Sequence, residues 1–191
     1  MSVERFPCAG ILLDACVVIN LFASKQMQAI LEALPRPVAI ATFVHEKEVL
    51  KIYTGPDDNI TAEAEAISLQ PFIDQKLLHV VPNDSRELAT MLKISETYID
   101  TGEAISAAIA RHRSWSLATD DKIALSFFMR NMPDLHLIST LDLVKHWAEA
   151  TQPHLAAIAD ALANIHKRAR YAPHHDHDLY QWWKMYQQGQ T

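Results

Sequence analysis

The sequence predicts an α/β protein in which a parallel sheet of four or five strands lies between two layers of helices. Short apolar runs, such as residues 10–13 and 38–41, have the continuous hydrophobicity of strands that are covered on both faces. Longer segments with helical spacing separate these runs. Strands that alternate with helices form parallel sheets with helices on both faces, so we expect a three-layer α/β/α fold.

Turn-forming and capping residues set the boundaries between the expected elements. Pro35 and Pro37 end the first helix, and Thr42 can cap the next one. Pro82 and Asn83 end a strand. In chain order we expect a strand at 10–13, a helix at 21–34, a strand at 38–41, a helix at 42–50, a loop at 55–59, a helix from 61, a strand at 77–81, helices at 85–95 and 101–112, a strand at 115–118, a helix at 120–129, a strand at 135–138 and a helix at 140–150.

The composition excludes several classes of protein. Of the 191 residues, 49 % are hydrophobic and 21 % are charged, which excludes disordered, collagen-like and coiled-coil chains. No stretch approaches about 20 uncharged apolar residues, so we expect no membrane span. Glu4 and Asp14 bracket the short apolar run near the start, so we expect no signal peptide. Cys8 and Cys16 make no disulfide framework, which favours a reducing, cytoplasmic location.

The charge balance limits how the chain could contact nucleic acid. There are 17 basic and 23 acidic residues, so the formal net charge is −6 with histidine neutral. This excess argues against a broad basic surface for nucleic acid, but not against an enzyme that handles phosphates through bound cations. Only four glycines occur, and no glycine-rich phosphate loop is present. A P-loop or dinucleotide site is therefore not expected.

Residues 1–150 form the expected domain, and residues 151–191 differ from it. The first part has 13 basic and 20 acidic residues, a net charge of −7, whereas the second has a net charge of +1 and five of the ten histidines. We expect a helix at residues 153–170 and an aromatic end at residues 180–186 that packs on the domain or on a partner. Dimerisation through this extension is a further expectation.

Acidic residues follow several of the expected strands or begin the next helix. In an open parallel sheet, ligands bind at the carboxyl ends of the strands, where such side chains meet. Clustered carboxylates repel one another unless cations lie between them, and Mg²⁺ and Mn²⁺ favour oxygen ligands. Helix capping and solvated loops are the alternative explanation. The acids placed in this way are Asp14, Glu48, Glu103, Asp120 and Asp121.

Five motifs extend this pattern across residues 8–148. The motifs are residues 12–22 (LLDACVVINLF), 44–50 (VHEKEVL), 100–105 (DTGEAI), 117–122 (LATDDK) and 137–144 (LISTLDLV). Together, and in this order, they resemble the apolar strand with its Asp, the E-V-L helix, the D-x-G-E-A helix start, the L-x-T-x-D strand end and the final strand and helix of PIN-domain proteins.

The resemblance implies a Mg²⁺- or Mn²⁺-dependent endoribonuclease that hydrolyses RNA phosphodiester bonds. It also implies a VapC-like toxin of a bacterial toxin–antitoxin pair, with a small antitoxin protein as partner. The metal-binding and catalytic residues that it implies are Asp14, Glu48, Glu103 and Asp121. The residues that it implies around them, which would orient carboxylates or water, are Asn20, Asp100, Thr119 and Asp120.

Two acids compete for the second position of the site. Glu46 and Glu48 would point about 200° apart on a helix, so only one of them can face the site. We prefer Glu48, because Val49 and Leu50 follow it as in the E-V-L motif.

Other readings of the sequence stay open. The acidic core has no obvious basic stripe for RNA, so a non-catalytic PIN-like interaction protein is the alternative. A haloacid-dehalogenase-type phosphatase needs an Asp at the position of Cys16, which we expect to be a small apolar residue instead. Residues 174–178 (HHDHD) could bind a transition metal or indicate a metal-dependent hydrolase, although an exposed polar tail also explains them.

Overall fold

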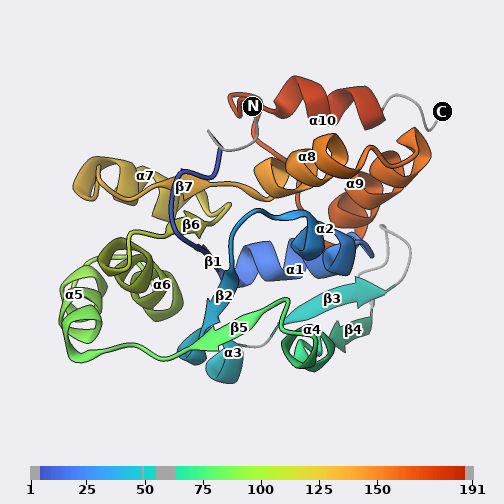
Figure 1. Cartoon of the computed structure of the whole chain (residues 1–191). Helices are drawn as coiled ribbons and strands as arrows, with labels where there is room; N and C mark the ends of the chain where they lie inside the picture. Colours follow the sequence, from blue (N-terminus) through green and yellow to red (C-terminus); the bar gives the residue numbers. More distant parts are fainter. Residues whose placement is uncertain (1–4, 49, 55–62, 188–191) are drawn as a thin grey trace.

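The computed structural model describes residues 5–48, 50–54 and 63–187, and its centre is a five-stranded parallel sheet (Figure 1). The strand order is β5-β2-β1-β6-β7. These strands are β1 (Ile11–Leu13), β2 (Val38–Ala41), β5 (His79–Val81), β6 (Ser116–Ala118) and β7 (Leu137–Ile138). The central strand β1 is completely buried, as its continuous apolar run predicts.

Helices cover both faces of the sheet, which confirms the predicted α/β class (Figure 1). Helix α6 packs on β1, β2 and β6, and α5 packs against α6; α1, α2, α8 and α9 pack together on the other side. The helices are α1 (Ala15–Ala23), α2 (Met27–Ala33), α3 (Thr42–Lys47), α4 (Gln70–Asp74), α5 (Ser85–Ser95), α6 (Thr101–His112), α7 (Lys122–Asn131), α8 (Thr140–Thr151), α9 (Leu155–Ala169) and α10 (Tyr180–Gln187).

The predicted single helix at residues 21–34 is wrong. Helix α1 begins directly after Asp14, and α2 follows after a break at Ser24–Gln26. Lys25 has a positive φ of 61°, and Ser24 Oγ accepts a hydrogen bond from the Gln26 backbone N–H at 3.0 Å. Both helices bury apolar residues, so the hydrophobic spacing continues across the break and does not reveal it.

The predicted helix at residues 42–50 is too long. Helix α3 ends at Lys47, and Glu48 has an extended backbone with φ −88° and ψ 138°. Leu50 N–H then donates to Glu48 O at 3.2 Å. Glu48 therefore lies just past the helix end, and its direction does not follow from helical spacing.

A two-stranded antiparallel sheet replaces the helix that was expected from residue 61. Strand β3 (Lys51–Thr54) pairs with β4 (Glu63–Ala66), with Ile52 opposite Glu65. Ile52 is buried, so β3 packs one face toward the core. The expected loop at 55–59 and Thr61 itself lie outside the described residues. The other predicted elements agree with the structure to within two residues at each end.

The C-terminal extension packs onto the sheet-and-helix core. Helix α9 contacts α1 and β3, and its buried residues Ile158, Leu162 and Ile165 join the same hydrophobic core as the strands. Helix α10 packs on α9, where the Trp183 ring meets the His166 ring edge-on (Figure 1). Within the described part of the chain, no helix is long and apolar enough to cross a membrane.

Candidate metal centre

Asp14 is the most deeply placed of the predicted acids. It follows β1 directly, and its backbone N–H donates to Ala118 O at 3.0 Å, which ties it to the end of β6. Its side chain is 5 % exposed. The Asp14 Oδ2 atom accepts hydrogen bonds from Thr119 Oγ1 and Cys16 Sγ, both at 3.1 Å. The first turn of α1 and the residue after β6 therefore fix the orientation of this carboxylate.

Thr119 connects Asp14 to the loop that carries Asp121. Its Oγ1 donates to Asp14 and accepts from the Asp121 backbone N–H at 3.3 Å. The Oδ1 atom of Asp121 caps α7 by accepting from the N–H groups of Ile123 and Ala124 at 2.8 and 2.9 Å. Helix α7 begins at Lys122 rather than at residue 120 because Asp121 occupies this capping position.

Gly102 gives Glu48 room beside the start of α6. A Cβ atom placed on Gly102 would overlap Glu48 Oε1 and would lie 2.9 Å from Glu48 Cδ. The Oδ1 atom of Asp100 would lie 3.5 Å from the same Cβ. Glu48 thus reaches the N-terminus of α6 across a position that only glycine permits without displacement. Glu46, in contrast, is exposed to solvent.

Asp100 and Glu103 form a capping box at the N-terminus of α6. Asp100 Oδ1 accepts from the Glu103 N–H at 2.8 Å, and Glu103 Oε2 accepts from the Asp100 N–H at 3.4 Å. Helix capping therefore accounts for part of what these two residues do, as the alternative explanation predicts. It also holds their carboxylates at one end of α6, next to Glu48.

The carboxylates influence one another's ionisation. Burial raises the pKa of Asp14, and the charge of Asp100 raises it further. Burial, followed by the charges of Asp14 and Asp100, raises the pKa of Glu48 to about 7. Burial and the charges of Asp100, Asp121 and Asp14 raise the pKa of Glu103 to about 7. Acids that follow β1, α3 and β6 and acids at the start of α6 therefore share one electrostatic site.

Asp120 belongs to a different network from the other acids. Its carboxylate accepts hydrogen bonds from Asn20 Nδ2 at 2.9 Å, from Tyr171 Oη at 3.1 Å, and from the backbone N–H (3.1 Å) and the hydroxyl of Thr140. Burial raises its pKa, and these hydrogen bonds oppose the shift. Asn20 therefore holds Asp120 rather than one of the four predicted metal ligands.

The donor set of the acid cluster (Asp14, Glu48, Asp100, Glu103 and Asp121) fits a hard divalent cation. All of its donors are carboxylate oxygens, which are the ligands that such cations prefer. Burial and the charges of Asp14 and Asp100 all raise the pKa of Glu48, so the negative charge of the cluster favours a cation. In the described part of the chain, however, no three of these acids bring ligand atoms within 4.8 Å of one another, whereas His174, His175 and Asp176 do. The acid cluster is thus an electrostatic site without a closed ligand shell.

Comparison with known proteins identifies the family of this chain. The family model named PIN domain matches residues 11–127, which is more than half of the chain and includes all the acids of the cluster. The chain belongs to the PIN-domain family. PIN domains are generally nucleases and typically use divalent metal ions. The match ends before α8, so the extension lies outside the matched part of this PIN protein.

A solved structure and the curated proteins complete the comparison. A toxin–antitoxin complex from Klebsiella pneumoniae is similar to this PIN protein at 14 % identity with a TM-score of 0.43, over 69 % of this chain and 98 % of that chain. None of the curated proteins matches this chain.

Sequence reasoning missed several residues that shape the site. Cys16 is not simply a small apolar residue, because its S–H donates to Asp14. Thr140 and Tyr171 hold Asp120, and Gly102 admits Glu48. The scarcity of glycine was a usable signal for Gly102, since one of only four glycines falls between two acids of a motif. No sequence pattern identifies Tyr171, which approaches from the extension.

Proposed function

We propose that this PIN protein is a Mg²⁺- or Mn²⁺-dependent endoribonuclease in which Asp14, Glu48, Glu103 and Asp121 hold the cation. The observation that carries the proposal is the electrostatic coupling of carboxylates from four separate elements. Such a cluster is costly in isolation, because burial and the charges of neighbouring carboxylates raise the pKa of both Glu48 and Glu103. A bound divalent cation offsets the cost, since it favours the ionised form of each ligand.

Each residue has a distinct part in this proposal. Asp14 provides a buried, oriented oxygen pair, because Thr119 and Cys16 fix its Oδ2. Glu48 and Glu103 provide adjustable ligands at the half-exposed side of the site, where RNA can enter. When bound, a divalent cation supplies Lewis-acid chemistry for hydrolysis of a phosphodiester. Asp100 adds negative charge beside Glu48 and Glu103.

The proposed biological setting is a bacterial toxin–antitoxin pair in the cytoplasm. It rests on the motif resemblance, which implies an RNA substrate and a small antitoxin protein as partner. We also propose a homodimer in which residues 151–191 contribute to the interface. Light scattering of the full chain is then expected to give the mass of two chains.

RNA cleavage by the purified protein tests the proposed function. We expect cleavage of a mixed RNA substrate with Mg²⁺ or Mn²⁺ and none with EDTA. Asp14→Asn and Asp121→Asn keep the size of the side chain but remove a charged ligand, so each is expected to lower the rate by at least about 100-fold. Asp160→Asn, at an exposed position of α9, is the matched control and should cleave at the wild-type rate.

Two outcomes would contradict the proposal. Undiminished cleavage by both variants would mean that the acid cluster does not carry the activity. No cleavage by the wild type, together with no Mg²⁺ or Mn²⁺ binding at millimolar concentration, would favour the non-catalytic interaction protein.

A further inference from the structure

The turn between α9 and α10 brings two imidazoles and a carboxylate together, and none of the three belongs to the acid cluster. His174 Nδ1 lies 3.3 Å from Asp176 Oδ2, and His175 Nε2 lies 2.9 Å from Asp176 Oδ1. The centroids of the two rings are 4.0 Å apart. One ligand atom from each of the three residues falls within 4.8 Å of the other two. All three side chains are exposed to solvent, so an ion can reach them without rearrangement of the core.

We propose that His174, His175 and Asp176 form a second metal site, which binds a transition-metal ion of the Zn²⁺ type. Two nitrogen donors and one oxygen donor suit Zn²⁺, Co²⁺, Ni²⁺ or Cu²⁺, whereas Mg²⁺ and Mn²⁺ favour all-oxygen sites. The acid cluster and this site therefore differ in the class of ion that they select. Three protein ligands leave at least one coordination position for water or a ligand.

The third histidine of the turn, His177, is engaged elsewhere. His177 Nδ1 accepts the Leu179 backbone N–H at 3.0 Å, close to the start of α10. In contrast, the only backbone contact recorded at His174 Nδ1 is a long one, 3.4 Å from the Asp176 N–H, in the described part of the chain. The geometry therefore selects His174 and His175, rather than His177, as the imidazole ligands.

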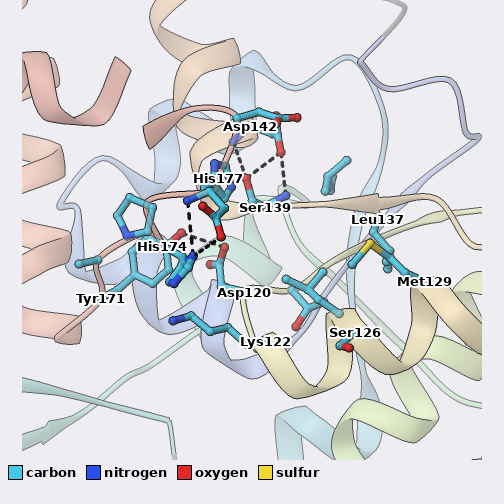
Figure 2. Close-up of a pocket in the computed structure, with 17 residues that line it drawn as sticks. Asp120, Lys122, Ser126, Met129, Leu137, Ser139, Asp142, Tyr171, His174 and His177 are labelled. Atoms are coloured by element: carbon cyan, nitrogen blue, oxygen red, sulfur yellow. Dashed lines mark hydrogen bonds and ion pairs between the residues drawn. The ribbon is translucent and has the colours of Figure 1, made fainter. Parts of the chain in front are cut away.

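The site lies at the edge of a pocket of about 500 Å³ between the extension and the PIN domain (Figure 2). His174 and Asp176 line this pocket together with Tyr171, Lys122 and Asp120. Figure 2 shows His174 beside Tyr171, whose hydroxyl bonds Asp120. An ion held by these three consecutive residues would order the turn at the edge of the pocket.

Zn²⁺ titration of the full chain tests the site. The starting protein is the Asp14→Asn variant with excess Mg²⁺ present, so that binding at the acid cluster does not dominate the signal. Isothermal titration calorimetry is expected to show one saturable Zn²⁺ site per chain. Removing a hydrogen-bonding neighbour of a metal ligand typically costs about 10- to 100-fold in affinity, so loss of a ligand itself should cost at least tenfold.

The ligand variants and their control decide the outcome. His174→Ala and His175→Ala are expected to weaken Zn²⁺ binding at least tenfold, and His79→Ala, at an exposed position of β5, should leave it unchanged. Because His174 and His175 are exposed, circular dichroism should show the same fold in all variants. Equal Zn²⁺ affinity in the ligand variants and the starting protein would overturn the proposal. The absence of saturable Zn²⁺ binding in the starting protein would also overturn it.

Discussion

Raising the pH of the metal-free protein from about 5 to 8 is expected to destabilise the fold. Burial favours the protonated, neutral form of Glu48 and Glu103, and both side chains lose their protons over this range. In the folded protein each has a pKa of about 7, compared with 4.5 for an ordinary glutamate. Between these values the folded state binds more protons than the unfolded state. Stability is therefore fully present below about pH 4.5 and falls as the pH rises through 7.

The size of the effect follows from the two shifts. A pKa difference of this size corresponds to about 3 kcal/mol per group at 1.36 kcal/mol per unit. Both residues are partly exposed to solvent, so screening reduces this to roughly half, or about 3 kcal/mol for the pair. For a chain of this length, that loss lowers the melting temperature by about 6–12 °C.

Thermal melts followed by circular dichroism measure this effect. The Glu48→Gln/Glu103→Gln double variant is the control, because it keeps the histidines and the other acids but removes the two titrations. The wild type should lose more stability than the double variant between about pH 5 and 8, and excess Mg²⁺ at pH 8 should restore it. Parallel pH profiles for the two proteins would refute the reasoning.

Three further substitutions probe the site and the fold. Gly102→Ala places a methyl group against the Glu48 carboxylate, so Mn²⁺ binding measured by calorimetry should weaken by about tenfold or more. Unchanged affinity would show that Glu48 is not a ligand of the site. In the wild type, the Arg113 guanidinium donates hydrogen bonds of 2.7 and 3.0 Å to the buried Glu87 carboxylate. Arg113→Ala leaves this carboxylate without its cationic partner. Urea unfolding should show a loss of about 3 kcal/mol, and a loss below about 1 kcal/mol would contradict this account. Tyr171→Phe removes one hydrogen-bond donor from the Asp120 carboxylate, and the same assay should show that the free energy of unfolding falls by about 1–2 kcal/mol. An unchanged midpoint would show that the extension does not stabilise the Asp120 network.

The sequence predicts the central sheet well because its strands are short, apolar and covered on both faces. Continuous apolar runs as short as residues 10–13 and 38–41 favour strands that are covered on both faces, and both runs contain strands in the structure. Helices with a clear cap are also predicted closely, such as α5 and α6, which begin after Asp84 and Asp100. In these segments the local preference and the tertiary packing agree.

The errors occur where a local backbone choice depends on distant contacts. The break at Lys25 and the end of α3 before Glu48 leave the hydrophobic pattern unchanged, so spacing does not detect them. Strands β3 and β4 pair with each other although eight residues, 55–62, separate them in the sequence. The helix prediction considered each segment alone and so did not include this pairing. Tertiary packing overrides segment preference at these points.

The candidate site could be predicted by residue type and order, but not by orientation. Glu48 lies beside the start of α6, but it extends from a residue beyond α3 and not from the helix on which the choice over Glu46 was argued. The adjacent residues Asp120 and Asp121 belong to different networks. Asn20 donates a hydrogen bond to Asp120, and the sequence does not reveal this contact. Adjacent side chains on a loop diverge, and the sequence does not say which way each one points.

The central claim is that the acid cluster holds a divalent cation, and the location of Mn²⁺ in a crystal tests it most directly. Anomalous diffraction from crystals grown with Mn²⁺ is expected to place an ion within about 2.5 Å of carboxylate oxygens from Asp14 and at least one more acid of the cluster. Asp14→Asn crystals should lose that peak. An ion found only at His174 and its neighbours, or no ion at the acid cluster at millimolar Mn²⁺, would contradict the account.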